Sequence, residues 1–94
     1  MAIFRWNPTK NDWLARVRGM TFEQIVAAVE AGHLLDILSH PNQERYPGQK
    51  LLVIKLQRYA WLVPMVESDD GFFLITAFPS RKATRKHLEN DDER

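Results

Sequence analysis

The spacing of apolar residues changes once along this chain, and this change limits its possible folds more than any other feature. Between residues 13 and 29, apolar side chains recur every three or four positions, which is the period of one face of an α-helix. From residue 34 onwards they form short runs rich in Val, Ile and Leu between turn-forming residues, as β-strands do. The apolar residues of the helical part are Trp13, Leu14, Val17, Phe22, Ile25, Val26 and Val29. The chain is therefore expected to form a short first strand, two helices and then a group of strands.

Capping residues predict where the two helices begin and where the first one ends. Asn7 is a favourable N-cap, Pro8 suits the first helical position, and Gly19 suits the left-handed residue that ends a helix. Thr21 and Gln24 have the spacing of a capping box, in which each side chain binds the other residue's backbone amide. We therefore expect helices that follow Asn7 and Thr21.

After the two helices, the strands are expected to follow one another through short connections. We predict strands at residues 3–6, 34–38, 51–56, 59–66 and 72–78, and a final short helix at 82–90. The segment 69–71 reads Asp-Asp-Gly and predicts a hairpin turn. Pro64 predicts an edge position or a bulge, because proline cannot donate to a β-ladder. Strands joined this closely run antiparallel. The prediction is an α+β domain, with an N-terminal strand and two helices packed on an antiparallel sheet.

The size and composition are those of one globular domain. The chain has 94 residues, 45% of them hydrophobic, and we assign residues 1–90 to one domain and 91–94 to an acidic tail. It has no cysteine, which excludes disulfides and thiolate metal sites, and its three histidines lack the spacing of zinc ligands. No apolar segment is long enough to span a bilayer or to form a signal peptide, so we expect a cytoplasmic protein. No metal or cofactor is expected.

Basic residues gather in two segments, although the net charge of the chain is only +1. The first segment contains Arg5, Lys10, Arg16 and Arg18, and the second contains Arg81, Lys82, Arg85 and Lys86. Acidic residues collect instead in the last six positions. A nearly neutral chain can therefore carry one strongly positive face.

Two blocks of the sequence have a distinctive order of residues. Residues 6–10 read Trp-Asn-Pro-Thr-Lys, and Gly19 follows that lysine nine residues later. Residues 80–86 read Ser-Arg-Lys-Ala-Thr-Arg-Lys, a basic run after the last predicted strand. In both blocks the chain resembles the BrnT family of bacterial toxins, whose members typically begin with Trp-Asp-Pro-x-Lys and end with Ser-Ala-Arg-x-Ala-Thr. It departs from that pattern at Asn7, where the family has an aspartate, and at Arg18, where it has a histidine.

This resemblance implies both a fold and a function. It implies a RelE-like domain of the RelE/ParE superfamily that acts as the toxin of a type II toxin–antitoxin system. Such toxins are described as metal-independent ribonucleases that inhibit translation and are silenced by a cognate antitoxin. The expected partners are then an antitoxin protein and RNA, free or on the ribosome, and no membrane.

Cleavage of RNA by its own 2′-hydroxyl needs a group that removes a proton, a group that returns one, and stabilisation of the phosphate charge. Fixed cations supply the last of these, which is often the largest. The candidate catalytic residues are Arg81, Lys10, Arg18 and His40. The candidate RNA-binding residues are Arg16, Lys82, Arg85, Lys86 and Tyr46. Structural alternatives stay open: a solvated Arg81 that begins a helix, an Arg18 that complements a helix dipole, and a His40 exposed in a polar loop.

Two other functions fit the same sequence. A non-catalytic module would bind RNA or a partner protein through the same basic face. A regulator that binds nucleic acid is a third candidate, although the apolar stripe of the second helix predicts burial rather than a recognition helix. The tryptophans and phenylalanines are expected mostly in the core, with one or two exposed at the edge of the sheet.

Overall fold

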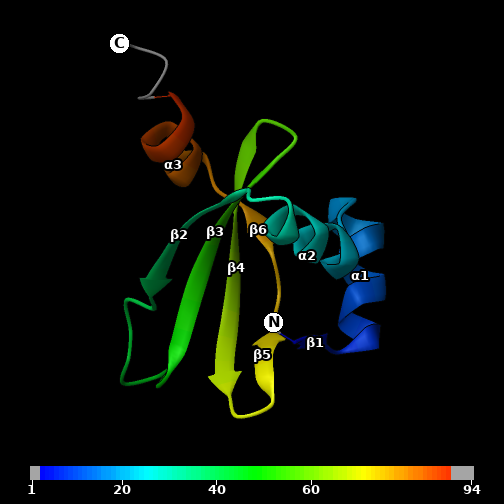
Figure 1. Cartoon of the computed structure of the whole chain (residues 1–94), viewed down its shortest axis with the longest axis vertical. Helices are drawn as coiled ribbons and strands as arrows, with labels where there is room; N and C mark the ends of the chain where they lie inside the picture. Colours follow the sequence, from blue (N-terminus) through cyan, green and yellow to red (C-terminus); the bar gives the residue numbers. More distant parts are fainter. Residues whose placement is uncertain (1–2, 90–94) are drawn as a thin grey trace.

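Helices and strands follow the chain in the order that the change of period predicts. In the computed structural model, which describes residues 3–89, two helices precede most of the strands and a third helical segment ends the fold (Figure 1). The elements are β1 (Phe4–Trp6), α1 (Pro8–Arg18), α2 (Phe22–Glu30), β2 (Leu34–Ser39), β3 (Gln49–Leu56), β4 (Tyr59–Ser68), β5 (Gly71–Leu74), β6 (Phe78–Pro79), α3 (Arg81–Thr84) and the π-helical turn η1 (Arg85–Glu89). The fold is α+β, as predicted. The acidic tail predicted at 91–94 lies outside the described residues.

The predicted caps of both helices are confirmed. The side-chain oxygen of Asn7 accepts hydrogen bonds from the backbone amides of Thr9, at 2.8 Å, and of the residue after it. Gly19 ends α1 with a φ of +65°. Thr21 and Gln24 form the capping box, each side chain bonded to the other residue's backbone amide. These local hydrogen bonds define the first turn of each helix.

Asn11 joins the two helices through contacts that its place in the sequence does not reveal. Its side-chain oxygen accepts a hydrogen bond from the backbone amide of Phe22, and its amide group donates one to the carboxylate of Glu23, both at 2.8 Å. The bond from Asn11, together with a backbone hydrogen bond at Glu23, lowers the pKa of the Glu23 carboxyl. Asn11 therefore satisfies an amide at the start of α2 that has no acceptor within the helix.

Replacing Asn11 by alanine is expected to lower the free energy of unfolding by about 1–2 kcal/mol, because the partly buried Phe22 amide loses its acceptor. Chemical denaturation measures this loss, and an NMR titration should show the pKa of Glu23 rising toward its ordinary value. The ionised Glu23 carboxylate accepts a stronger bond from Asn11 than the protonated carboxyl does. The stability difference between the two proteins should therefore shrink as the pH falls through that pKa. An unchanged Glu23 pKa in the variant contradicts the role assigned to Asn11.

The sheet is mixed rather than antiparallel. Its strands lie in the order β1-β5-β4-β3-β2, and β6 also pairs with β4. The pairings among β2 to β6 are antiparallel, as predicted, but β1 runs parallel to β5, with Phe4 opposite Phe72. The prediction of a wholly antiparallel sheet is therefore wrong. It rests on strands joined by short turns, whereas β1 is joined to the sheet through two helices, which allow a parallel pairing.

The strand β4 lies in the middle of the sheet although it contains Pro64. On one side of β4, all residues of β3 are paired with it. On the other side β5 pairs with β4 as far as Met65, and β6 pairs with it from Leu62. Pro64 faces the interval between these two strands, where its carbonyl accepts a hydrogen bond from the amide of Ile75 at 2.9 Å. The predicted edge position is therefore wrong. The segment predicted as one strand at 72–78 forms two strands, β5 and β6. The gap between them lies opposite Pro64, which has no N–H to donate to a neighbouring strand.

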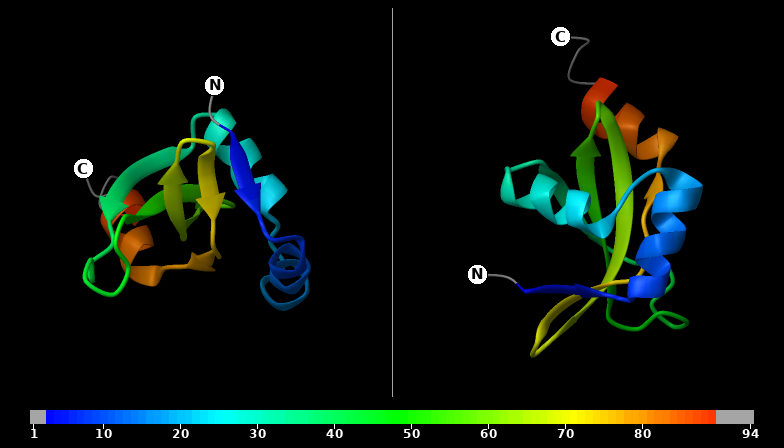
Figure 2. Two further views of the ribbon diagram at one scale, coloured as in Figure 1. Left: turned by 90° about the horizontal axis from the view of Figure 1, so that it is seen from below. Right: turned by 90° about the vertical axis from the view of Figure 1, so that its right-hand side faces the viewer.

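Different helices cover the two faces of the sheet. The helices α1 and α2 pack on one face, and Leu14 and Phe22 are fully buried there. The segment of α3 and η1 packs on the other face around Val53 and Ala60, and Figure 2 shows it set apart from α1 and α2. Val17, expected on the apolar side of the first helix, is 57% exposed. In the part of the chain that the structure describes, no helix is long and apolar enough to cross a membrane.

Aromatic side chains contribute mainly to the core, as expected. Trp6 stacks on Phe22 with ring centroids 5.6 Å apart, and Phe4 contacts Phe72 at the same separation. Phe73, near the edge of the sheet, is 42% exposed. These contacts attach the short strand β1 to α2 and to β5.

Candidate functional site

Ser80 and Thr84 dock the last helix onto the sheet. Ser80 caps α3 by accepting a hydrogen bond from the Ala83 amide at 3.0 Å, and its own amide donates to the Ala60 carbonyl at 2.9 Å. The hydroxyl of the buried Thr84 donates to the Ser80 carbonyl at 2.7 Å and accepts from the Ala60 amide at 2.8 Å. Ala83 and Leu88 add apolar contacts with the sheet. One side of the segment from α3 to η1 is thereby held against β4.

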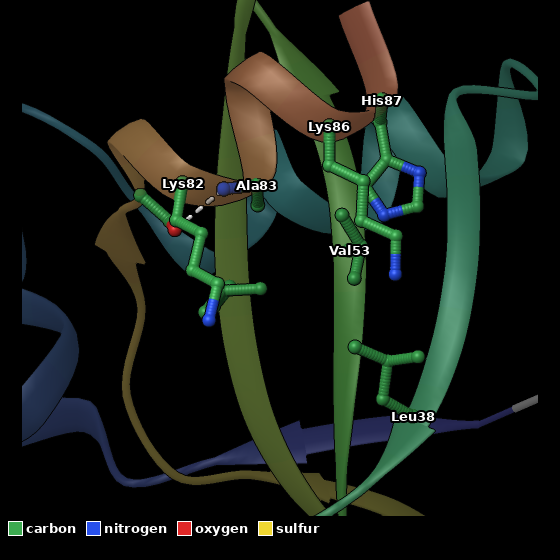
Figure 3. Close-up of a pocket in the computed structure, with 8 residues that line it drawn as sticks. Leu38, Val53, Lys82, Ala83, Lys86 and His87 are labelled. Atoms are coloured by element: carbon green, nitrogen blue, oxygen red, sulfur yellow. Dashed lines mark hydrogen bonds between the residues drawn. The ribbon is translucent and has the colours of Figure 1, made fainter.

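The basic residues of this segment remain accessible to solvent. Arg81, Lys82, Arg85 and Lys86 are exposed, and His87 is half-buried. A pocket of about 250 Å³ lies between the segment and the sheet. The side chains of Lys82 and Lys86 extend from the helix over the sheet, and His87 lines the same pocket (Figure 3). We refer to Lys82, Lys86 and His87 as the basic rim.

The floor of the pocket is apolar and comes from three neighbouring strands. Leu38 of β2, Val53 of β3 and Leu62 of β4 form this apolar floor. Leu62 lies opposite Val53 in the register of β3 and β4, so that the two side chains share one face of the sheet. A pocket of this kind suits a ligand in which a flat or apolar part is joined to an anionic group. Nucleotides have this composition, and so do amphipathic acidic peptides.

Lys10 and Arg18 come together around Trp13 on α1. The ammonium of Lys10 lies 3.9 Å from the centroid of the indole, and the guanidinium carbon of Arg18 lies 4.8 Å from it. Both distances are within the range of a cation–π interaction. Arg18 also donates a hydrogen bond to the carbonyl of Ala77, in the link between β5 and β6. Arg18 therefore has a structural role in joining α1 to this link, and its catalytic role stays a prediction.

His40 and Tyr46 lie together in the loop that joins β2 to β3. Their ring centroids are 4.4 Å apart, and Nδ1 of His40 accepts a hydrogen bond from the Asn42 amide at 3.0 Å. The side-chain amide of Gln43 donates to the carbonyls of His40 and of Gln49. The loop is thus held by its own hydrogen bonds, and it lies at the end of the sheet away from α3 (Figure 1). The structure does not bring His40 to the basic rim.

The other predicted site residues are exposed and lie on different elements. They are Arg16 on α1, Arg81 on α3 and Arg85 on η1. Among the described side chains of residues 3–88, the ion pairs are Arg5 with Asp70 at 3.8 Å and Lys50 with Glu67 at 3.3 Å, and neither pair involves a predicted site residue. In the same range, no group of three or more His, Asp or Glu side chains is arranged to hold a metal ion.

His87 belongs to the pocket, although the sequence pattern did not single it out. Helical spacing offers a signal for it, because His87 follows the docked Ala83 by four residues and so lies on a neighbouring part of the helix surface. Thr84 was also missed. The available signal is its position four residues after the capping Ser80, from which its hydroxyl reaches the Ser80 carbonyl.

A comparison of the chain with protein-family models, with curated proteins and with solved structures gave no match.

Proposed function

We propose that this chain binds RNA in the pocket between the sheet and the segment from α3 to η1, and that it is the toxin of a type II toxin–antitoxin pair. The observation that carries the proposal is the basic rim above an apolar floor. The ammonium groups of Lys82 and Lys86 attract phosphates. The apolar floor can cover the face of an unstacked base. Single-stranded RNA presents these two chemical groups side by side along the chain.

The dimensions of the pocket favour a single strand over a duplex. We infer that the pocket of about 250 Å³ receives a single unstacked base. The bases of a duplex are stacked and paired, and they cannot enter a pocket without leaving the stack. We therefore expect the ligand to be a loop or an unpaired segment of RNA.

The proposal extends to the family and to the reaction. We propose that the α+β fold is a RelE-like domain of the RelE/ParE superfamily, because residues 6–10 and 80–86 resemble the BrnT toxins. In the proposed metal-independent cleavage, the 2′-oxygen loses its proton and bonds to phosphorus, while the bond from phosphorus to the 5′-oxygen breaks. That oxygen takes up a proton, and the products are a 2′,3′-cyclic phosphate and a 5′-hydroxyl. Lys82 and Lys86 stabilise the charge on phosphate, and His87 exchanges a proton.

A non-catalytic module that binds RNA is the second candidate, and one observation favours it. The residues predicted to be catalytic do not gather at one place. Lys10 and Arg18 contact Trp13, His40 is held within its own loop, and Arg81 is exposed on α3. This module would use the same pocket without cleaving the RNA.

Expression of the chain without an antitoxin is expected to arrest growth reversibly, and the purified chain is expected to cleave single-stranded RNA in the presence of a chelator. The His87→Gln variant should keep most of its RNA affinity but cleave on the order of 10²-fold more slowly, because it can no longer exchange a proton. Arg81→Ala, measured in the same two assays, tests whether that exposed cation also stabilises the reacting phosphate.

Each outcome separates the candidates. RNA that is bound by the wild-type chain but stays intact supports the non-catalytic module. Cleavage by His87→Gln at the wild-type rate removes His87 from the reaction. Unaltered growth together with no binding of single-stranded RNA contradicts the proposed function as a whole.

A further inference from the structure

The hairpin between β3 and β4 has a backbone conformation that its residues do not favour. Leu56 pairs with Tyr59, so Gln57 and Arg58 form a two-residue turn. Their φ angles are +53° and +69°, and both residues are in the left-handed region. Turns of this type favour Asn and Gly, because a side chain is crowded in that region. The pairing of β3 with β4 holds the turn in this conformation.

This turn lies at the end of the sheet where α3 is docked. Ala60, two residues after Arg58, accepts the hydrogen bond from the Ser80 amide at 2.9 Å and donates one to the Thr84 hydroxyl at 2.8 Å. The turn and α3 are neighbours in both Figure 1 and the right-hand view of Figure 2. The contacts that fix α3 therefore also fix its position next to the turn.

Two exposed cations belong to this end of the sheet. Arg58 stands in the turn itself. Lys55 lies opposite Ala60 in the ladder of β3 and β4, and so on the face of the sheet that carries α3. Arg81 of α3 and Arg85 of η1 are also exposed, and they belong to the segment that is docked at this end of the sheet.

We propose that Arg58, assisted by Lys55, is a second phosphate contact for the RNA strand of which one nucleotide occupies the pocket. This inference rests on the proposed function. A glycine at position 58 would adopt the same backbone without crowding, but it would lack a guanidinium that binds phosphate through two parallel hydrogen bonds. Strained residues persist where the surrounding structure determines them, and they often stand at functional positions.

Arg58→Gly is expected to change stability and RNA binding in opposite directions. Its Tm should rise by about 4 °C, because glycine relieves the strain in the turn. Its affinity for a labelled single-stranded oligoribonucleotide, measured by fluorescence anisotropy, should fall about three- to fivefold. The salt dependence of binding should also fall by about one phosphate contact. Gln57→Asn is the matched control. It relieves strain at the neighbouring position, and it should raise the Tm while leaving RNA affinity and salt dependence unchanged.

The outcomes distinguish this inference from the proposed function. If the wild-type chain binds no single-stranded RNA, the proposed function fails and this inference fails with it. If the wild-type chain binds RNA and Arg58→Gly binds it equally well, the inference is overturned and the pocket remains the RNA site. If Arg58→Gly loses both stability and binding, the Lys55→Gln variant tests whether the hairpin contacts RNA, since this substitution leaves the turn unchanged. Weaker RNA binding by Lys55→Gln at the wild-type Tm supports a contact at the hairpin, and unchanged binding overturns it.

Discussion

Replacing Lys82 and Lys86 together by glutamate is expected to weaken RNA binding on the order of 10²-fold and to leave the fold intact. Both side chains are exposed, whereas Ala83, Thr84 and Leu88 dock the helix onto the sheet. Exposed substitutions away from packed groups change the free energy of unfolding by less than about 0.5 kcal/mol each. At the pocket, however, two charges that attract phosphate become two charges that repel it. The RNA binding that remains should also depend less steeply on salt.

A second double variant, Arg5→Glu with Lys50→Glu, is the matched control for this experiment. It changes the net charge by the same amount, and it alters exposed cations that pair with Asp70 and Glu67. The loss of such exposed ion pairs costs little stability. The control should bind RNA much more tightly than the pocket variant. If the two double variants lose the same affinity, RNA binding follows the net charge of the protein and the pocket is not the site.

Features that depend on neighbouring residues could be predicted from the sequence, and features that depend on distant residues could not. Asn7, Thr21 and Gln24 act on amides within three residues of themselves, and their caps are confirmed. By contrast, the second capping interaction of α2 comes from Asn11, eleven residues before the amide that it binds. The position of Pro64 in a central strand depends on where β5 stops and β6 begins, and no local pattern specifies that interval.

The same distinction between neighbouring and distant residues applies to the candidate site. The basic run at 81–86 is contiguous in the sequence, so it could be selected as a cationic segment. The apolar floor could not be predicted, because Leu38, Val53 and Leu62 become neighbours only through the register of three strands. The histidine of the pocket depends on where α3 docks, and that is decided by the hydrogen bonds of Thr84 and Ser80 with β4.

Replacing Gly71 by alanine is expected to be strongly destabilising, with a loss of about 3 kcal/mol or more in the free energy of unfolding. Gly71 has a φ of +124°, in a region that favours glycine. A Cβ at this position would lie 2.2 Å from the carbonyl oxygen of Ile3, a backbone atom that cannot move aside by a change of rotamer. The same oxygen accepts a hydrogen bond from the Phe72 amide at 2.8 Å, where β1 begins to pair with β5. The clash therefore acts on the contact that attaches the N-terminal strand.

Gly32→Ala separates the effect of the backbone conformation from the effect of this clash. Gly32 has a φ of +89°, but apart from its own atoms and those of its two chain neighbours, no atom of the described structure lies within 4 Å of the position of its Cβ. This variant therefore bears the conformational cost alone, about 1–2 kcal/mol. Hydrogen exchange of the backbone amides then shows which part of the fold is destabilised. In Gly71→Ala the Phe72 amide should exchange faster, because its acceptor on Ile3 is displaced, and in Gly32→Ala its protection should change little. Equal losses of stability in the two variants would contradict this prediction, and so would continued protection of the Phe72 amide in Gly71→Ala. Either result would mean that β1 stays paired with β5 and that the clash of the new Cβ with Ile3 does not destabilise the protein.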